Sequence, residues 1–192
     1  MIDKIKDLFS NYNFLGPKEL LFLAANSKLC LVKKDEFIVK QGDLSYNTIT
    51  VVKGLLRHFV IDENGVEKTL LFVPEKGTSA IPDTFFHQKT SSENVQAVEN
   101  SVIIKFDIRL MDQAADKNIR LLKLQNRLIK RSLMDAIEHI KFLNLLTPEE
   151  RYLLFCKTYP KLEQRVKQKH LASYLGITPT SLSRVRARIS AE

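Results

Sequence analysis

A heptad repeat of apolar side chains within residues 115–140 constrains the fold more than any other feature of this chain. Its members are spaced alternately four and three residues apart, and one polar residue, Asn126, stands among them. This spacing predicts a long helix that pairs through one stripe with the same helix of a second copy, where an Asn sets the register of a parallel dimer. The alternative is a long amphipathic helix buried against its own chain. The expected dimer seam is Ala115, Ile119, Leu122, Asn126, Ile129, Leu133, Ala136 and Ile140, and a second row, Leu121, Leu124 and Leu128, is expected to pack on the preceding domain.

The residues before this helix have the pattern of a small β domain. Short runs rich in β-branched and aromatic residues, such as 37–39, 48–52 and 70–73, alternate with turn residues. Turns every ~8–12 residues between short strands indicate an all-β barrel or sandwich. Asn64-Gly65 is the clearest hairpin signal, because both residues tolerate a positive φ. Two short helices are expected ahead of the strands, the second beginning at Pro17.

Three helices are predicted after the long one. Thr147 is expected to cap the first, which has Pro148 in its first turn and Glu150 in position to complete a capping box. This helix is expected to end near Thr158, before Tyr159-Pro160. The other two helices are predicted from about residue 167 to 175 and from residue 179 onward, so only a short turn separates them.

Residues 168–185 have the spacing of a helix-turn-helix. Gly176 ends the first helix where a positive φ is needed, Thr178 caps the second, and Pro179 preorganises its first turn. Ala172 is small because the second helix crosses close to it, and Ile177 plugs the turn. Such a unit presents its second helix to the major groove of DNA, whereas an ordinary helical hairpin is the alternative. The expected core between the two helices is Leu171, Leu175, Leu182 and Val185.

The outward face of the second helix is small, polar and basic, as a DNA-reading face requires. Arg184 is expected to contact guanine, because its planar guanidinium matches the O6 and N7 acceptors. Arg186 is expected either to contact phosphate or to stay solvated. Further base-reading candidates are Thr180, Ser181, Ser183 and Arg188, and the candidates for phosphate contacts, which position without specifying, are Gln168, Lys169 and Thr178.

The net charge of +8 is concentrated in the C-terminal part of the chain. Residues 1–108 hold 13 Lys and Arg against 14 Asp and Glu, whereas residues 109–192 hold 17 against 8. A basic domain joined to a neutral one indicates a polyanionic partner at one end.

Cysteine and histidine usage favours neither a disulfide framework nor a metal site. Cys30 and Cys156 lie far apart, and the four histidines lack metal-ligand spacing. No cofactor and no metal are predicted. No apolar run approaches the roughly 20 residues needed to span a bilayer, and the N-terminus alternates charged with apolar residues, unlike a signal peptide. We therefore expect a cytoplasmic chain without a membrane partner.

With these parts in this order, the chain resembles the Crp/Fnr family of bacterial transcription regulators. The resemblance covers about Phe14 to Ile189, and residues 34–43 and 52–57 are similar to the family's cyclic-nucleotide-binding β-roll. It implies an α+β chain: a β-roll sensor (a double-stranded β-helix, or jelly roll) at residues 1–108, a dimerisation helix at 109–142 and a helix-turn-helix domain at 143–192. It also implies double-stranded DNA as a partner, a homodimer, RNA polymerase as a further partner, and the bacterial cytoplasm as location.

The ligand cassette departs from that of the family's cyclic-AMP binders. Those proteins carry a Gly-Glu pair, whose glutamate holds the ribose hydroxyl, and an arginine that neutralises the phosphate. Here Ile81-Pro82 stands in place of Gly-Glu, and no arginine occurs between Arg57 and Arg109. Because a buried phosphate without a cation is costly, we expect no tight binding of cyclic AMP. The degenerate cassette is Ile81, Pro82, Asp83, Ser92, Glu93 and Asn94, where Glu93 would repel a phosphate.

Three further expectations concern the sensor and the end of the sequence. Two cysteines cannot hold the four-cysteine iron–sulfur cluster of the family's oxygen sensors. The family usually adds a β-hairpin wing after its recognition helix, but this sequence stops at Glu192, so reading is expected to rest on the helix-turn-helix alone. Another small-molecule effector is conceivable: Phe72, Phe85, Phe86, His87 and Val95 either line a modified pocket or form the core and flap of the β-roll.

Three functions follow from these patterns. The leading one is a dimeric DNA-binding transcription regulator that reads a pseudo-palindromic site. The second is a ligand-binding or protein-binding module that has lost specific DNA binding. The third, an enzyme, has little support, because no nucleophile–base pair, paired carboxylates or Gly-rich phosphate loop stands out.

Overall fold

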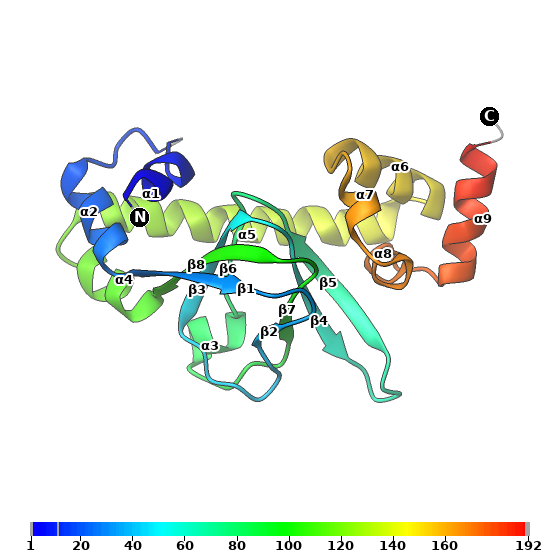
Figure 1. Cartoon of the computed structure of the whole chain (residues 1–192), viewed down its shortest axis with the longest axis horizontal. Helices are drawn as coiled ribbons and strands as arrows, with labels where there is room; N and C mark the ends of the chain where they lie inside the picture. The colour runs from blue at the N-terminus through cyan, green and yellow to red at the C-terminus, as the bar shows by residue number, and fades with distance from the viewer. Residues whose placement is uncertain (1, 11, 191–192) are drawn as a thin grey trace.

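The computed structural model describes residues 2–10 and 12–190, which form a β-sandwich, a long helix and a C-terminal group of helices (Figure 1). Two short helices, α1 (Ile2–Leu8) and α2 (Pro17–Ala25), precede the strands. The strands are β1 (Ser27–Val32), β2 (Phe37–Val39), β3 (Asn47–Lys53), β4 (Leu56–Ile61), β5 (Glu67–Val73), β6 (Thr78–Ser79), β7 (Asn94–Ala97) and β8 (Ser101–Asp107), with helix α3 (Pro82–His87) between β6 and β7. The later helices are α4 (Ile108–Ala115), α5 (Ile119–Leu145), α6 (Pro148–Thr158), α7 (Leu162–Arg165), α8 (Gln168–Tyr174) and α9 (Pro179–Ile189).

Two antiparallel four-stranded sheets form the sandwich, with strand orders β1-β8-β3-β6 and β2-β7-β4-β5. Their inner faces share one apolar core, in which Ile49 and Ile103 of the first sheet meet Leu56 of the second. The β4–β5 hairpin turns at Gly65, whose φ is +76°, and the Asp62 carboxylate accepts hydrogen bonds from two amides of the turn. The predicted β domain and its Asn-Gly hairpin are therefore confirmed.

Helix α5 spans from the sandwich to the C-terminal helices (Figure 1). Its inner side packs with the outer face of the first sheet, where Leu121 and Leu124 share a core with Ile104 and Phe106. Leu128 is partly buried against the same cluster. The second apolar row of the helix thus packs on the preceding domain, as its spacing predicts.

The long helix begins later than the sequence predicts. Residues 109–115 belong to the separate helix α4, and Asn118 caps α5 by accepting hydrogen bonds from the amides of Arg120 (2.9 Å) and Leu121 (3.3 Å). Ala115, the first expected seam residue, ends α4 and is buried against the chain's own core. Its assignment to the seam was wrong, and the helix continues to Leu145, beyond the expected end at 142.

The C-terminal head, which we define as α6 to α9 (residues 148–189), has its own apolar core. Phe155, Leu171 and Leu182 are buried there together with Phe72 of β5, so the head and the sandwich share an apolar contact. The predicted capping box at the start of α6 is present, since Thr147 and the side chain of Glu150 bond each other's backbone amides. Helices α3 and α7 were not predicted.

No helix of the described ranges is long and apolar enough to cross a membrane. Helix α9 ends at Ile189. The expected lack of a wing concerns the end of the sequence. Residues 191 and 192 lie outside the described residues, so the lack of a wing stays a prediction.

Candidate nucleic-acid interface

Helices α8 and α9 form a helix-turn-helix with the predicted local geometry. Gly176 has a φ of +68°, a conformation that glycine adopts without strain. The Thr178 hydroxyl caps α9 by accepting a hydrogen bond from the Ser181 amide at 3.1 Å. A guanidinium nitrogen of Arg151 in α6 donates to the carbonyl of Leu175 and so fixes the end of α8. The expected core residues Leu171, Leu175, Leu182 and Val185 are all buried, and so is Ala172, where the second helix was expected to cross.

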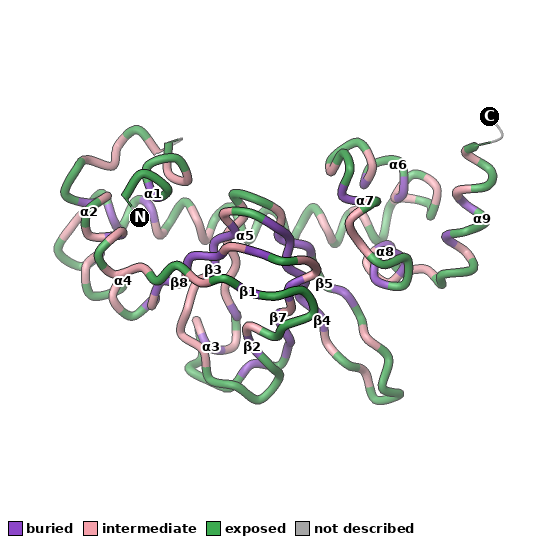
Figure 2. Tube along the Cα trace, viewed as in Figure 1, coloured by how far each residue is buried: buried purple, intermediate pink, exposed green. Residues whose placement is uncertain are grey.

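The outward side of α9 is open to solvent. Figure 2 shows α9 as mostly exposed, and its buried residues are Leu182 and Val185. Thr180, Ser183 and Arg184 are exposed, and the Arg184 side chain has no ion pair among the described residues. The helix therefore presents short polar side chains and one arginine, which suit close approach to a groove.

The first turn of α8 lies next to this face. Gln168 donates hydrogen bonds to the Ser183 hydroxyl (2.7 Å) and to the carbonyl of Pro179 (3.2 Å), so it joins the two helices at their N-terminal ends. Lys169 is exposed beside it. The three expected phosphate contacts, Gln168, Lys169 and Thr178, thus come from the starts of two neighbouring helices, where backbone N–H groups also favour anions.

Two arginines of α9 are held by carboxylates within the head. Arg186 pairs with Glu163 at 2.9 Å and lies over the Tyr152 ring, with its centroid 5.7 Å away. Arg188, expected to read bases, pairs with Glu149 of α6 at 2.7 Å. Its guanidinium must leave this carboxylate before it can contact a base.

The degenerate cassette is filled by its own side chains. Ile81 is buried, and Pro82 begins α3. The Asp83 carboxylate accepts hydrogen bonds from the amide (3.1 Å) and the hydroxyl of Ser92, and these bonds hold its pKa below the usual value. Glu93 is buried near the imidazole of His58, with 3.3 Å between Oε1 and Nδ1.

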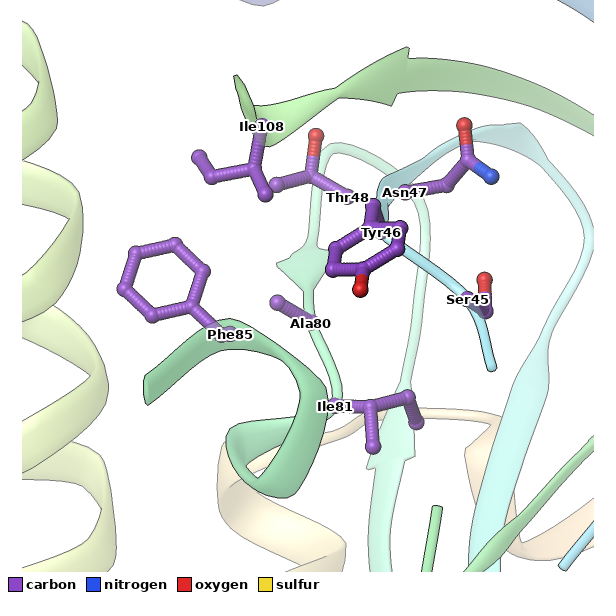
Figure 3. A pocket seen from close by; sticks show the side chains of 8 residues that line it. All are labelled: Ser45, Tyr46, Asn47, Thr48, Ala80, Ile81, Phe85 and Ile108. Carbon is purple, nitrogen blue, oxygen red and sulfur yellow. The ribbon is translucent and has the colours of Figure 1, made fainter. Parts of the chain in front are cut away.

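Among the described residues, no cationic side chain lines the recess next to the cassette. The recess is lined by neutral residues, including Tyr46, Ile81 and Phe85 (Figure 3). It is too narrow to hold a water molecule. Arg109 lines a neighbouring hollow of about 200 Å³, which shares Tyr46, Phe85 and Ile108 with this recess. Asn94, the last cassette residue, instead accepts a hydrogen bond from the Gln41 amide at 3.0 Å. Arg57, the arginine that precedes the cassette in sequence, is bonded to Glu67 and Gln96, away from this recess.

The five residues proposed for a modified pocket do not meet in one place. Phe72 packs on Phe155 and Tyr174 of the head, and Val95 lies in the core of the sandwich. Phe86 is 61% exposed. Phe85 alone among the five lines the recess beside α3. The structure therefore favours the alternative, in which these side chains form the core and flap of the β-roll.

Sequence reasoning also missed a set of residues that join the head to the sandwich. Arg57, Glu67 and Thr69 of the sandwich contact His170 and Ser173 of α8. No sequence signal marks these pairs, because the residues are about a hundred positions apart.

The chain has relatives of known class in sequence and in fold. No protein-family model matches it. The transcriptional activator protein Anr of Pseudomonas aeruginosa is 25% identical over 171 residues, which are 82% of this chain and 68% of the relative. FixK2 from Bradyrhizobium japonicum has a similar structure, with a TM-score of 0.76 and 16% identity over 86% of this chain and 85% of that one. A protein of Eubacterium rectale assigned to the transcriptional regulators of the Crp/Fnr family matches with a TM-score of 0.74 and 15% identity over 96% of this chain and 88% of that one.

Proposed function

Because the chain is Crp/Fnr-like in sequence and in fold, we propose that it is a homodimer that binds a pseudo-palindromic DNA site through α9. The observation that carries this proposal is the exposed, polar, arginine-bearing face of α9 in a complete helix-turn-helix. The proposal places the chain with its DNA in the bacterial cytoplasm.

The free face of α5 supports the homodimer. Ile119, Leu133 and Ile140 are 63%, 59% and 60% exposed, although all three are apolar. Leu122 and Leu143 continue the same stripe, and both are 37% exposed. A stripe of this length at heptad spacing matches the seam of a parallel two-stranded coiled coil, and the opposite side of the helix is already used by the sandwich.

In the proposed complex the N-terminal ends of α8 and α9 contact phosphates, and the exposed face of α9 reads bases. Arg184 would form two hydrogen bonds to one guanine, with Thr180, Ser181 and Ser183 beside it. Gln168, Lys169 and Thr178 would hold the DNA backbone. In a dimer the two α9 helices would enter successive major grooves about one helical turn apart.

We also propose that the chain does not respond to cyclic AMP. The cassette holds Glu93 rather than a cation, Ile81 fills the space next to α3, and the recess there has no room for a nucleotide. A phosphate at this position would be buried without a positive partner, at a cost of several kcal/mol.

Selection of bound sequences from random duplex DNA tests both proposals at once. The purified chain is expected to enrich a two-fold-related motif, and cyclic AMP is expected to leave the motif and the affinity unchanged. No enriched sequence, together with the absence of a salt-dependent gel shift, would instead favour a module that has lost DNA binding. A motif that appears only with the nucleotide would overturn the proposal on cyclic AMP.

Replacing Arg184 with Ala is expected to weaken specific binding by about 1–3 kcal/mol and to relax the preference at one base pair of each half-site. The reason is that two hydrogen bonds to a single guanine are lost while phosphate contacts stay. Repeating the sequence selection with this variant measures both effects. Lys157→Ala is the matched control, since it removes one exposed positive charge of the same head from α6 and is expected to leave the motif unchanged. An unchanged motif and affinity for the Arg184 variant would show that Arg184 does not read the site.

A further inference from the structure

The head is docked on the sandwich through α8, which lies beside β5, the edge strand of the second sheet. The centre of this contact is Arg57 of β4, a charged side chain that is only 1% exposed. A charge at such depth is stable only when it is paired and hydrogen-bonded. Its partners are therefore informative about what the contact does.

Arg57 joins both sides of the contact. Its guanidinium donates to the Glu67 carboxylate at 2.7 Å and to the Gln96 amide oxygen at 3.3 Å, and it lies 3.9 Å from the centroid of the Phe59 ring. All of these groups belong to the sandwich. One guanidinium nitrogen also meets Nδ1 of His170, which belongs to α8. Since a guanidinium only donates, Nδ1 must be the acceptor and His170 must be neutral.

Flanking contacts hold α8 in one position along the strand. The Ser173 hydroxyl accepts from the Thr69 amide at 2.8 Å and donates to the Glu67 carbonyl at 3.2 Å, so it completes the free edge of β5. Arg165, just before α8, bonds the carboxylates of both Glu75 and Glu99 at 2.7 Å. The two hydrogen bonds of Ser173 therefore fix the helix along the strand, and Arg165 adds two ion pairs just before the start of the helix.

Docking leaves the reading face of α9 free. Among the described residues, the hydrogen bonds and ion pairs to the sandwich come from residues outside α9, and Thr180, Ser183 and Arg184 remain exposed. Figure 1 shows α8 beside the sandwich and α9 at the far end of the molecule. The contact therefore orients the head without covering the face that would meet DNA.

We propose that Arg57 is a positioning residue for DNA recognition, which holds the head at the angle that sets the distance between the two α9 helices of the dimer. This inference rests on the proposed function. The sandwich and α5 form the frame of the dimer, and the chain enters the head through residues 146 and 147. Without the contact at Arg57, the head keeps its internal fold and its base preference, but its angle to the frame is less well defined.

The test measures spacing separately from base reading. A series of operators is made from the selected motif, with the two half-sites moved apart or together one base pair at a time. The wild-type chain is expected to prefer one spacing sharply. Arg57→Met is expected to keep the half-site motif, to bind the best spacing about tenfold more weakly, and to bind the neighbouring spacings almost as well, because paired sites lose avidity when their geometry is not fixed.

Arg109→Met is the matched control. Arg109 also pairs with a carboxylate, Asp107, at 2.5 Å and lies over an aromatic ring, with the Tyr46 centroid 4.3 Å away. Its partners all belong to the sandwich side. This variant loses an ion pair and a contact with an aromatic ring, although at a more exposed site, and it is expected to keep the wild-type spacing preference.

A pair of variants in α8 keeps the test decisive if Arg57→Met folds poorly. His170→Asn retains a short side-chain acceptor for Arg57, whereas His170→Leu has none. We expect a broad spacing preference for the Leu variant and a return toward the wild type for the Asn variant. A sharp, unshifted preference in both Arg57→Met and His170→Leu would overturn the inference. If the wild-type chain selects no sequence at all, it is the proposed function that fails, and this inference falls with it.

Discussion

Replacing Leu133 with Asp is expected to turn the dimer into a monomer and to lower affinity for a two-half-site operator by about a thousandfold, or about 4 kcal/mol. Leu133 lies in the middle of the apolar stripe of α5 and is 59% exposed in the single chain. A dimer would bury two facing carboxylates there without cations. Sedimentation measures the change in mass, and gel shifts on operators with one and two half-sites measure the lost avidity.

Met134→Asp is the control for this variant. Met134 is the neighbouring residue, is apolar and 52% exposed, and points away from the heptad stripe. It is expected to leave the dimer intact. If the Leu133→Asp chain sediments as a dimer, the dimer interface does not lie on this face of α5.

A substitution at Asn126, on the same seam, is expected to change dimer stability in the opposite direction. Asn126→Leu is expected to keep or raise dimer stability and to loosen the register, because a buried Asn specifies register at a cost in stability. A monomer in this variant would place Asn126 outside the seam.

The head was predictable because its signals are local. Gly176, Thr178 and Pro179 each act on a neighbouring turn, and the structure shows the positive φ, the cap and the first-turn proline that these residues predict. The heptad and the second apolar row of α5 are equally local patterns. The sequence alone therefore predicts these helices and the faces that they bury. It does not show what covers the exposed apolar face of α5.

The misplaced start of α5 has a different cause. The heptad continues backward through Ala115 at the right spacing, so periodicity alone extends the helix across residues 116–118. The stronger signal was Asn118, a residue type that favours N-caps, and its side chain does bond two amides of the first turn. At this position the capping preference of Asn118, and not the apolar heptad, determines where α5 begins.

The contact between head and sandwich could not be predicted at all. Arg57 and His170 are 113 residues apart, and nothing near either one in sequence indicates the other. In sequence His170 looks like one more polar residue of α8, and Arg57 looks like an ordinary charge in a strand. Only the tertiary fold, which buries both, gives them a common role.

That buried contact is expected to weaken in mild acid. Burial and the neighbouring Arg57 charge lower the pKa of His170 from 6.5 to about 4, so the docked histidine stays neutral where a released one takes up a proton. The contact is at full strength above pH 6.5 and loses strength as the pH falls toward 4. Between pH 6.5 and about pH 5 the loss is about 2 kcal/mol, at 1.36 kcal/mol for each pH unit.

Other groups near His170 do not cancel this dependence. Lys169 of α8 and Lys167, the residue before α8, lower the pKa of the imidazole together with Arg57. Glu67 favours protonation, but the hydrogen bond and charge of Arg57 outweigh its burial and keep its pKa below the usual value, so its charge is constant in this range. His139 does add to the effect, because burial lowers its pKa as well.

Urea unfolding at pH 7.5 and pH 5 separates the two histidines. His139→Phe removes one titrating group and keeps a ring that can stack on Tyr174 and Phe142, so it removes the contribution of His139 from the loss of stability in acid. His170→Asn keeps an acceptor for Arg57 but cannot be protonated, and it is expected to lose about 2 kcal/mol less than the wild type on acidification. If His170→Asn and the wild-type chain lose equal stability, the imidazole is not held neutral against Arg57. The docking of α8 would then depend on its other contacts, with Ser173 and Arg165 as the residues to test next.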